Sequence, residues 1–127
     1  MATRSLIGIK LGDIVKTIYC HWDGYPEGVG TTLVNHYNTP AKITELMEMG
    51  DVSSLGDTVK DSIFYHRDRK EPWGMVEPRD MWDVELRSVA NDHDADYYYV
   101  YTNENEWECF KNDGTQIDIL SGKVALN

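Results

Sequence analysis

Hydrophobic and polar positions alternate in two stretches near the N-terminus, which is the pattern of β-strands. The stretches cover residues 5–11 and 14–22, and Leu11-Gly12-Asp13 connects them. So short a connection with a glycine predicts an antiparallel hairpin. One side of the second strand is mostly apolar and is expected to contact the core; it consists of Ile14, Lys16, Ile18, Cys20 and Trp22.

The apolar spacing then changes from two residues to three or four, which is typical of helices. We expect a helix over residues 26–37, because Pro26 suits a first turn and an apolar residue recurs every four positions. A second helix is expected over residues 40–49, with Thr39 as its N-cap and Gly50 just after its end. The predicted buried positions of the two helices are Val29, Leu33, Tyr37, Ile43, Leu46 and Met47.

The pattern is weaker between residues 58 and 96 and becomes clear again afterwards. We expect a short strand at 62–66, a helix at 81–90 and an acidic turn at 91–96. Three strands follow, over residues 97–102, 106–111 and 115–120, and short Asn- and Gly-containing turns make them a meander. Residues 121–127 form either a tail or a further strand.

These elements predict an α+β fold within one domain spanning residues 1–127. We expect an antiparallel sheet built from the N-terminal hairpin and the C-terminal three-strand meander. The helices are inserted between these two parts and are expected to pack on one face of the sheet. Unpaired strand edges and a surface rich in aromatic rings favour a homo-oligomer, and a dimer is the commonest form.

The net charge of −10 narrows the range of partners. Twenty-two acidic residues against twelve basic ones disfavour binding to nucleic acid, whose phosphates would be repelled. No apolar run is long enough to span a membrane, and residues 1–4 lack the apolar segment of a signal peptide, so we expect a cytoplasmic protein. Cys20 and Cys109 are expected to be reduced, buried residues, and no metal-ligand spacing is present.

No catalytic motif is present in the sequence. The nucleophile elbow, the Walker loop, the dinucleotide-binding fingerprint and the metalloprotease motif are all missing. His21 and Asp23 are two apart on the expected strand and could pair as base and orienter, but a structural or ligand-contacting His21 is favoured. We therefore expect a noncatalytic protein without a cofactor.

Two segments are candidates for ligand binding. Residues 18–30 place the rings of His21, Trp22 and Tyr25 beside glycines at a strand end, where they could stack on a nucleobase. The other interpretation is that Trp22 and Tyr25 anchor the core.

The second candidate is the basic run at residues 66–70, followed by Trp73. Arg67 and Arg69 could each bind a phosphate or carboxylate through two hydrogen bonds. The other interpretation is that these side chains pair with nearby acids on a solvated face.

The string Ile18 to Gly30, IYCHWDGYPEGVG, together with the pattern at residues 43–56, resembles a family of small uncharacterised proteins of tailed bacteriophages. The resemblance covers residues 4–56 well and is weaker beyond them. Accessory phage proteins of this kind often counter host immunity, so it implies an anti-defence protein acting in the host cytoplasm.

Two modes of action fit the resemblance. One is a sponge that sequesters a nucleotide immune signal, as the anti-CBASS and anti-Thoeris sponges do; no binding residue of those families can be transferred to this chain. The other is an acidic inhibitor that binds a host defence protein, as many anti-CRISPR proteins do, or that imitates DNA.

Overall fold

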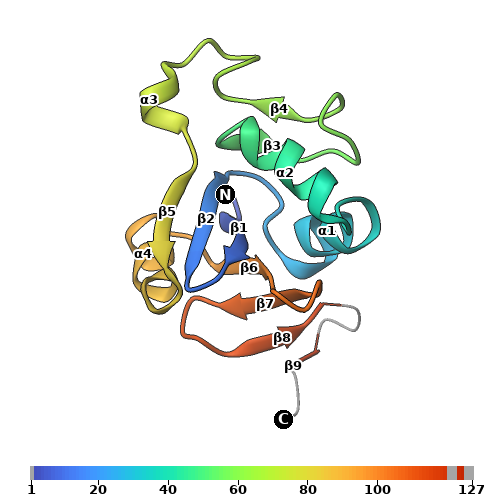
Figure 1. Ribbon diagram of the computed structural model, residues 1–127, viewed down its shortest axis with the longest axis vertical. Coiled ribbons are helices and arrows are strands. Elements are labelled where there is room, and N and C mark those ends of the chain that lie inside the picture. Colours follow the sequence, from blue (N-terminus) through green and yellow to red (C-terminus); the bar gives the residue numbers. More distant parts are fainter. Residues whose placement is uncertain (1, 120–122, 125–127) are drawn as a thin grey trace.

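The computed structural model describes residues 2–119 and 123–124 (Figure 1). Within these residues, nine strands form one mixed sheet in the order β4-β3-β2-β1-β6-β7-β8-β9, and β5 also pairs with β2. The α+β class is therefore confirmed. The strands are β1 (Ser5–Leu11), β2 (Ile14–Cys20), β3 (Val52–Ser54), β4 (Ile63–Phe64), β5 (Arg79–Trp82), β6 (Tyr97–Tyr101), β7 (Trp107–Lys111), β8 (Gln116–Asp118) and β9 (Lys123–Val124).

The helices are short and lie mainly between β2 and β6. A π-helical turn, Pro26–Gly30, leads directly into α1 (Thr31–His36), and α2 (Pro40–Glu48) follows. After β4 come α3 (Trp73–Val76), a 3₁₀ turn at Asp83–Glu85, and α4 (Leu86–Asp92). A tail or a further strand is expected at residues 121–127. Within this range β9 pairs antiparallel with β8, and the other residues lie outside the described part of the chain.

The hairpin β1–β2 and the meander β6–β7–β8 are antiparallel, as predicted. The expectation of a wholly antiparallel sheet was wrong at the junction between them, because β1 and β6 run parallel, with Ser5 opposite Tyr97 and Ile9 opposite Tyr101. The strands β2 and β3 also run parallel where Cys20 faces Val52. Parallel neighbours require a long crossover, and the helical insertion between β2 and β6 provides it.

Helices cover both faces of the sheet. The expected packing on one face is correct for α1 and α2, which bury one side of β1 and β6 around Ile7 and Tyr99. It was wrong for α4, which covers the opposite side around Leu6 and Tyr98. All residues from Ser5 to Ile9 are buried, as expected for a central strand with both faces covered.

The predicted helix at 81–90 is a strand in its first part. Residues Arg79–Trp82 form β5, because they continue the sheet along the outer edge of β2 at Ile14–Thr17. The carboxylate of Glu85 accepts a hydrogen bond of 2.9 Å from the Trp82 backbone N–H, so helical structure starts only after Trp82. Long-range strand pairing outweighs the helical spacing of the apolar residues here.

The second predicted helix is confirmed together with its two ends. The hydroxyl of Thr39 accepts a hydrogen bond of 3.3 Å from the Lys42 N–H, as an N-cap does. Gly50 follows the helix with φ at 78°. A Cβ atom at this position would lie 2.5 Å from the Val76 carbonyl oxygen, so both backbone conformation and space require glycine.

The outer edge of β2 divides between two partners, and Asp51 lies where they separate. β5 pairs with the first half of β2 and β3 with its last residue. The Asp51 carboxylate accepts a hydrogen bond of 2.8 Å from the Tyr19 N–H and one of 3.5 Å from Arg79 of β5. The Asp51 main chain bonds to the Val76 oxygen and the Tyr65 N–H. Asp51 is 6% exposed, and burial raises the pKa of its carboxyl group.

We expect Asp51→Ala to lower the free energy of unfolding by about 1–3 kcal/mol, because the Tyr19 N–H loses its acceptor at a buried position. Asp51→Asn should cost less, since the amide oxygen can still accept that bond and a desolvated charge is removed. Urea unfolding followed by circular dichroism measures both. The exposed Asp92→Ala variant is the control, and equal losses for Asp51→Ala and Asp51→Asn would contradict the assigned role.

Candidate functional site

A polar cleft of about 540 Å³ lies beside the end of β2. Four segments meet there: the residues before β1, the residues after β2, the end of α4 with the residues that follow it, and the turn after β7. The predicted site residues His21 and Trp22 both line it. The complete lining is Ala2, Arg4, His21, Trp22, Asn91, Asp94, Asp96 and Asn112.

The backbone of β3 holds the aromatic corner in place. The N–H groups of His21 and Trp22 donate to the carbonyl oxygens of Val52 and Ser53 over 3.1 and 3.0 Å. The Trp22 side chain is nevertheless 45% exposed and contacts His21 edge-on, with 4.8 Å between the ring centroids. Trp22 is therefore not a core anchor, and its indole is available to a ligand.

The surroundings of His21 favour its neutral form. Its Nδ1 lies 2.7 Å from the Tyr19 hydroxyl. Burial raises the pKa of Tyr19 to about 12, so this hydroxyl keeps its proton and can either donate a hydrogen bond to Nδ1 or accept one from it, depending on the tautomer of His21. Burial lowers the pKa of His21, and the positive charges of Arg4 and Arg69 lower it further. A neutral imidazole that accepts at Nδ1 carries its hydrogen on Nε2 as a donor.

Arg4 is the cation that lines the cleft. Its only ion pair among the described residues is one long contact of 3.4 Å to Asp94, whose side chain is 83% exposed. The Nε atom of Arg4 is buried and has no hydrogen-bond partner within the described residues. The guanidinium group is therefore only weakly paired within the described residues.

The opposite wall is held by two asparagines. The amide nitrogen of Asn91 donates to the carbonyl oxygens of Arg87 and Asn112, at 2.8 and 2.9 Å. That of Asn112 donates to the Ala95 oxygen at 3.2 Å. These bonds fix the wall between α4 and the turn after β7.

Two further predicted residues lie near the cleft without lining it. Arg69 is exposed, and its charge reaches His21, whose pKa it helps to lower. Tyr25 is 37% exposed and donates from its hydroxyl to Asp23 over 3.3 Å. Tyr25 is thus neither a core anchor nor part of the cleft. The neighbouring Gly24 is held by Tyr99, whose hydroxyl donates a 2.7 Å hydrogen bond to the Gly24 carbonyl oxygen.

Arg67 has internal partners, in agreement with the second interpretation of the basic run. Its guanidinium donates to both carboxylate oxygens of Asp68 over 2.9 Å. It also donates to the carbonyl oxygens of Ser62 and Val59, at 2.7 and 3.1 Å, and lies 5.1 Å from the centroid of the Phe64 ring. Arg67 stabilises the 59–68 segment, and we leave it out of the candidate ligand site.

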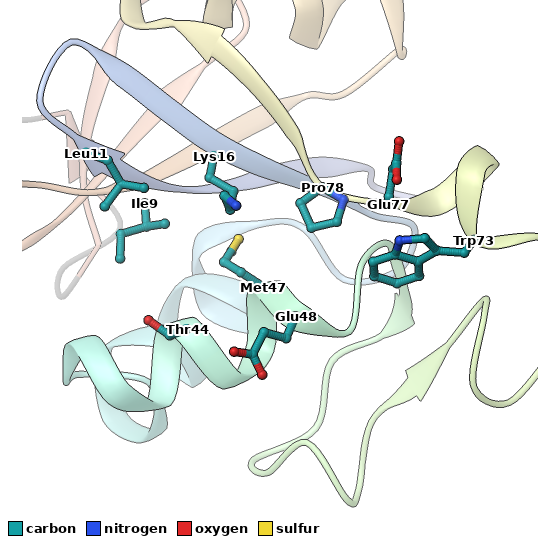
Figure 2. A pocket seen from close by; sticks show the side chains of 9 residues that line it. All are labelled: Ile9, Leu11, Lys16, Thr44, Met47, Glu48, Trp73, Glu77 and Pro78. Carbon is teal, nitrogen blue, oxygen red and sulfur yellow. The ribbon is translucent and has the colours of Figure 1, made fainter.

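Trp73 belongs to a different site, an apolar cleft of about 470 Å³ (Figure 2). Its indole contacts His66 edge-on at 5.3 Å. This apolar cleft shares no lining residue with the polar cleft. Its lining consists of Ile9, Leu11, Lys16, Thr44, Met47, Glu48, Trp73, Glu77 and Pro78.

The sequence reasoning missed Arg4 and the two asparagines. Arg4 is an isolated basic residue before the first strand, whereas the basic residues of 66–70 are close together in the sequence. Asn91 was assigned to a turn and lies in α4. The alternating pattern could have placed Arg4 next to the start of β1, but only the parallel pairing of β1 with β6 brings it to Asp94 and Asp96.

The described residues also show two absences. None of their helices is long and apolar enough to cross a bilayer. No group of three or more histidine, cysteine, aspartate and glutamate side chains in this part of the chain is arranged to hold a metal ion.

We expect NMR titration of the histidine ring signals to give His21 a pKa below the usual value of about 6.5. Arg4→Met should raise it, because a neighbouring positive charge is removed, whereas Arg87→Met should leave it unchanged. If the pKa of His21 is lower in the folded than in the unfolded chain, the unfolded chain takes up the proton at a higher pH. The contribution of His21 to stability is therefore present above about pH 6.5 and is lost as the pH falls through the pKa of His21 in the folded protein. A pKa of His21 at or above the usual value would contradict this assignment.

No family model matches the chain, and no curated protein or solved structure matches it either. Its function is therefore inferred from the chemistry of its side chains.

Proposed function

We propose that the protein binds a small nucleotide-like ligand in the polar cleft and does not transform it. One observation carries this proposal: Arg4 lines the same cleft as His21 and the exposed indole of Trp22, and Arg69 is close enough for its charge to lower the pKa of His21. In a chain with a net charge of −10, two positive charges thus lie near a flat ring, and the cleft lining adds the carboxylates of Asp94 and Asp96. Such a pairing suits a molecule with a base and a phosphate.

Each part of the ligand has a corresponding side chain. A base stacked on Trp22 would contribute about 1–3 kcal/mol. Arg4 offers donors to the phosphate, and the Nε2 hydrogen of His21 adds a further donor. Asp96 can accept hydrogen bonds from the amino groups of a base, whereas Asp94 is paired with Arg4. The ligand that fits best therefore carries amino groups and an anion together.

His21 supports binding rather than catalysis. Its Nδ1 is already bonded to Tyr19, and burial and two arginines disfavour its protonated form. In the tautomer that accepts at Nδ1, His21 presents a hydrogen-bond donor to the cleft instead of a general base. Sequestration of a signal requires only such binding. Together with the resemblance to small phage proteins, this makes a nucleotide signal of host immunity the ligand that we propose.

Calorimetric titration with cyclic dinucleotides and with cyclic ADP-ribose isomers tests the proposal. We expect one of them to bind and to be recovered unchanged, as mass spectrometry would verify. Trp22→Leu and Arg4→Met should each weaken binding by about tenfold, the loss of one stacked base or one charge-assisted contact. The matched controls Trp73→Leu and Arg87→Met should retain the affinity of the unmodified protein.

Asp94→Asn is expected to tighten ligand binding, whereas Trp22→Leu and Arg4→Met are expected to weaken it. Asp94 competes with an anion for Arg4, so its neutralisation should tighten the binding of a phosphate-bearing ligand and raise the association rate. Measuring both constants by calorimetry and stopped-flow fluorescence separates these effects. No heat and no thermal shift with any nucleotide of the panel would rule out the proposed function.

The second candidate function is inhibition of a basic host defence protein. Three glutamates, Glu104, Glu106 and Glu108, line one shallow cleft at the turn between β6 and β7. Reversing their charges should weaken capture of such a protein in a salt-dependent way. It should leave nucleotide binding in the polar cleft unchanged, so the two candidate functions are distinguishable.

A further inference from the structure

We propose that the apolar cleft is a second ligand site, which takes a free small molecule with an apolar body and a single anionic head group. The cleft lies between the β1–β2 hairpin and α2, and Trp73 of α3 lies at one end (Figure 2). Its volume of about 470 Å³ falls in the range of small-molecule sites. Nothing in the proposed nucleotide function depends on it.

The walls of the cleft are mainly apolar. Ile9 and Leu11 come from β1, Met47 from α2, and Trp73 and Pro78 from the segment that leads into β5. Leu11 is 54% exposed and Trp73 is 37% exposed, so apolar surface is available without any rearrangement of the core. Burying such surface against the apolar body of a ligand is favourable in water.

Lys16 supplies the charge complementarity that selects an anion. In Figure 2 its side chain points from β2 into the space between the hairpin and α2. Its ammonium group forms no ion pair within the part of the chain that the structure describes, although Asp80 is its cross-strand neighbour on β5. An ammonium group among apolar side chains and without a counter-ion favours a ligand that brings one.

The two glutamates of the lining limit the ligand to one negative charge. Figure 2 shows the carboxylates of Glu48 and Glu77 directed away from the cleft, on opposite sides of it. They do not occupy the position beside Lys16, but they would repel a second anionic group at either end. A monocarboxylate or monosulfonate is therefore favoured over a nucleotide with several phosphates.

The aromatic end of the cleft is held in place before any ligand arrives. The ring of Trp73 lies against His66 and over Gly50, where its atoms would be 3.1 Å from an added Cβ. The Trp73 carbonyl oxygen accepts the Glu77 N–H over 2.8 Å, which closes the turn of α3. A fixed aromatic surface reduces the entropy lost on binding.

Two dyes that differ in charge provide the test. 1-Anilinonaphthalene-8-sulfonate is anionic, and N-phenyl-1-naphthylamine has the same ring system without the sulfonate. We expect the anionic dye to bind the full chain about tenfold more tightly, the effect of one charge-assisted contact. Decanoate should displace it, and decyltrimethylammonium, with the same chain length and the opposite charge, should not. Fluorescence titration measures all four.

Variants of Lys16 separate the head-group contact from general hydrophobic binding. Lys16→Met should remove most of the preference for the anionic dye and leave the neutral dye unaffected, whereas Lys16→Arg should retain the preference. Lys42→Met, on the exposed side of α2, is the matched control. Circular dichroism establishes that each variant is folded, and Lys16→Arg keeps the test valid if Lys16→Met does not fold.

Three results would overturn the proposal. One is equal affinity for both dyes, and another is an unchanged preference in Lys16→Met. The third is dye binding that disappears as the protein concentration rises, because a second copy of the chain would then cover the cleft. None of these results bears on nucleotide binding, which is measured through Trp22 and Arg4 on the other side of the sheet.

Discussion

The carboxylate of Asp51 allows one strand to serve two neighbours. β2 pairs with β5 along its first half and meets β3 at its end, and a backbone N–H at the division would otherwise lack a partner. Asp51 accepts that N–H and also contacts Arg79 of β5, while its main chain bonds to the segments of α3 and β4. Since an unsatisfied buried donor costs about 1–3 kcal/mol, this contact stabilises the junction of the two outer parts of the sheet.

Both clefts depend on this division. On one side of it, β3 extends along His21 and Trp22 and holds the aromatic corner at the surface. On the other side, β5 leads into α4, which carries Asn91 to the opposite wall of the polar cleft. The segment before β5 brings Trp73 to the apolar cleft. Both clefts are thus built on segments that adjoin the outer edge of β2, and they lie on opposite faces of the sheet.

The use of basic residues explains where ligands can bind in so acidic a chain. Arg67 and Arg79 bond to carboxylates and carbonyl oxygens within the fold. Among the described residues, Arg4 has one long ion pair to Asp94, Arg69 is exposed, and Lys16 has no ion pair. A dense run of basic residues in the sequence therefore does not show that their side chains are available to a ligand. Asp68 follows Arg67 directly and its carboxylate bonds to the Arg67 guanidinium.

The predicted homo-oligomer stays a prediction.

Local patterns in the sequence determined much of the fold. Alternation and glycine turns defined the hairpin and the meander, and Thr39 and Gly50 defined the ends of α2, because these preferences act over a few residues. The aromatic corner was likewise recognisable, and His21 and Trp22 do line a cleft. Only the tertiary structure decided the parallel pairing of β1 with β6, the strand at Arg79–Trp82, and the position of α4 on the second face. It also decided that Arg4 faces His21, since contacts between residues distant in the sequence are set by the pairing of strands and not by local preference.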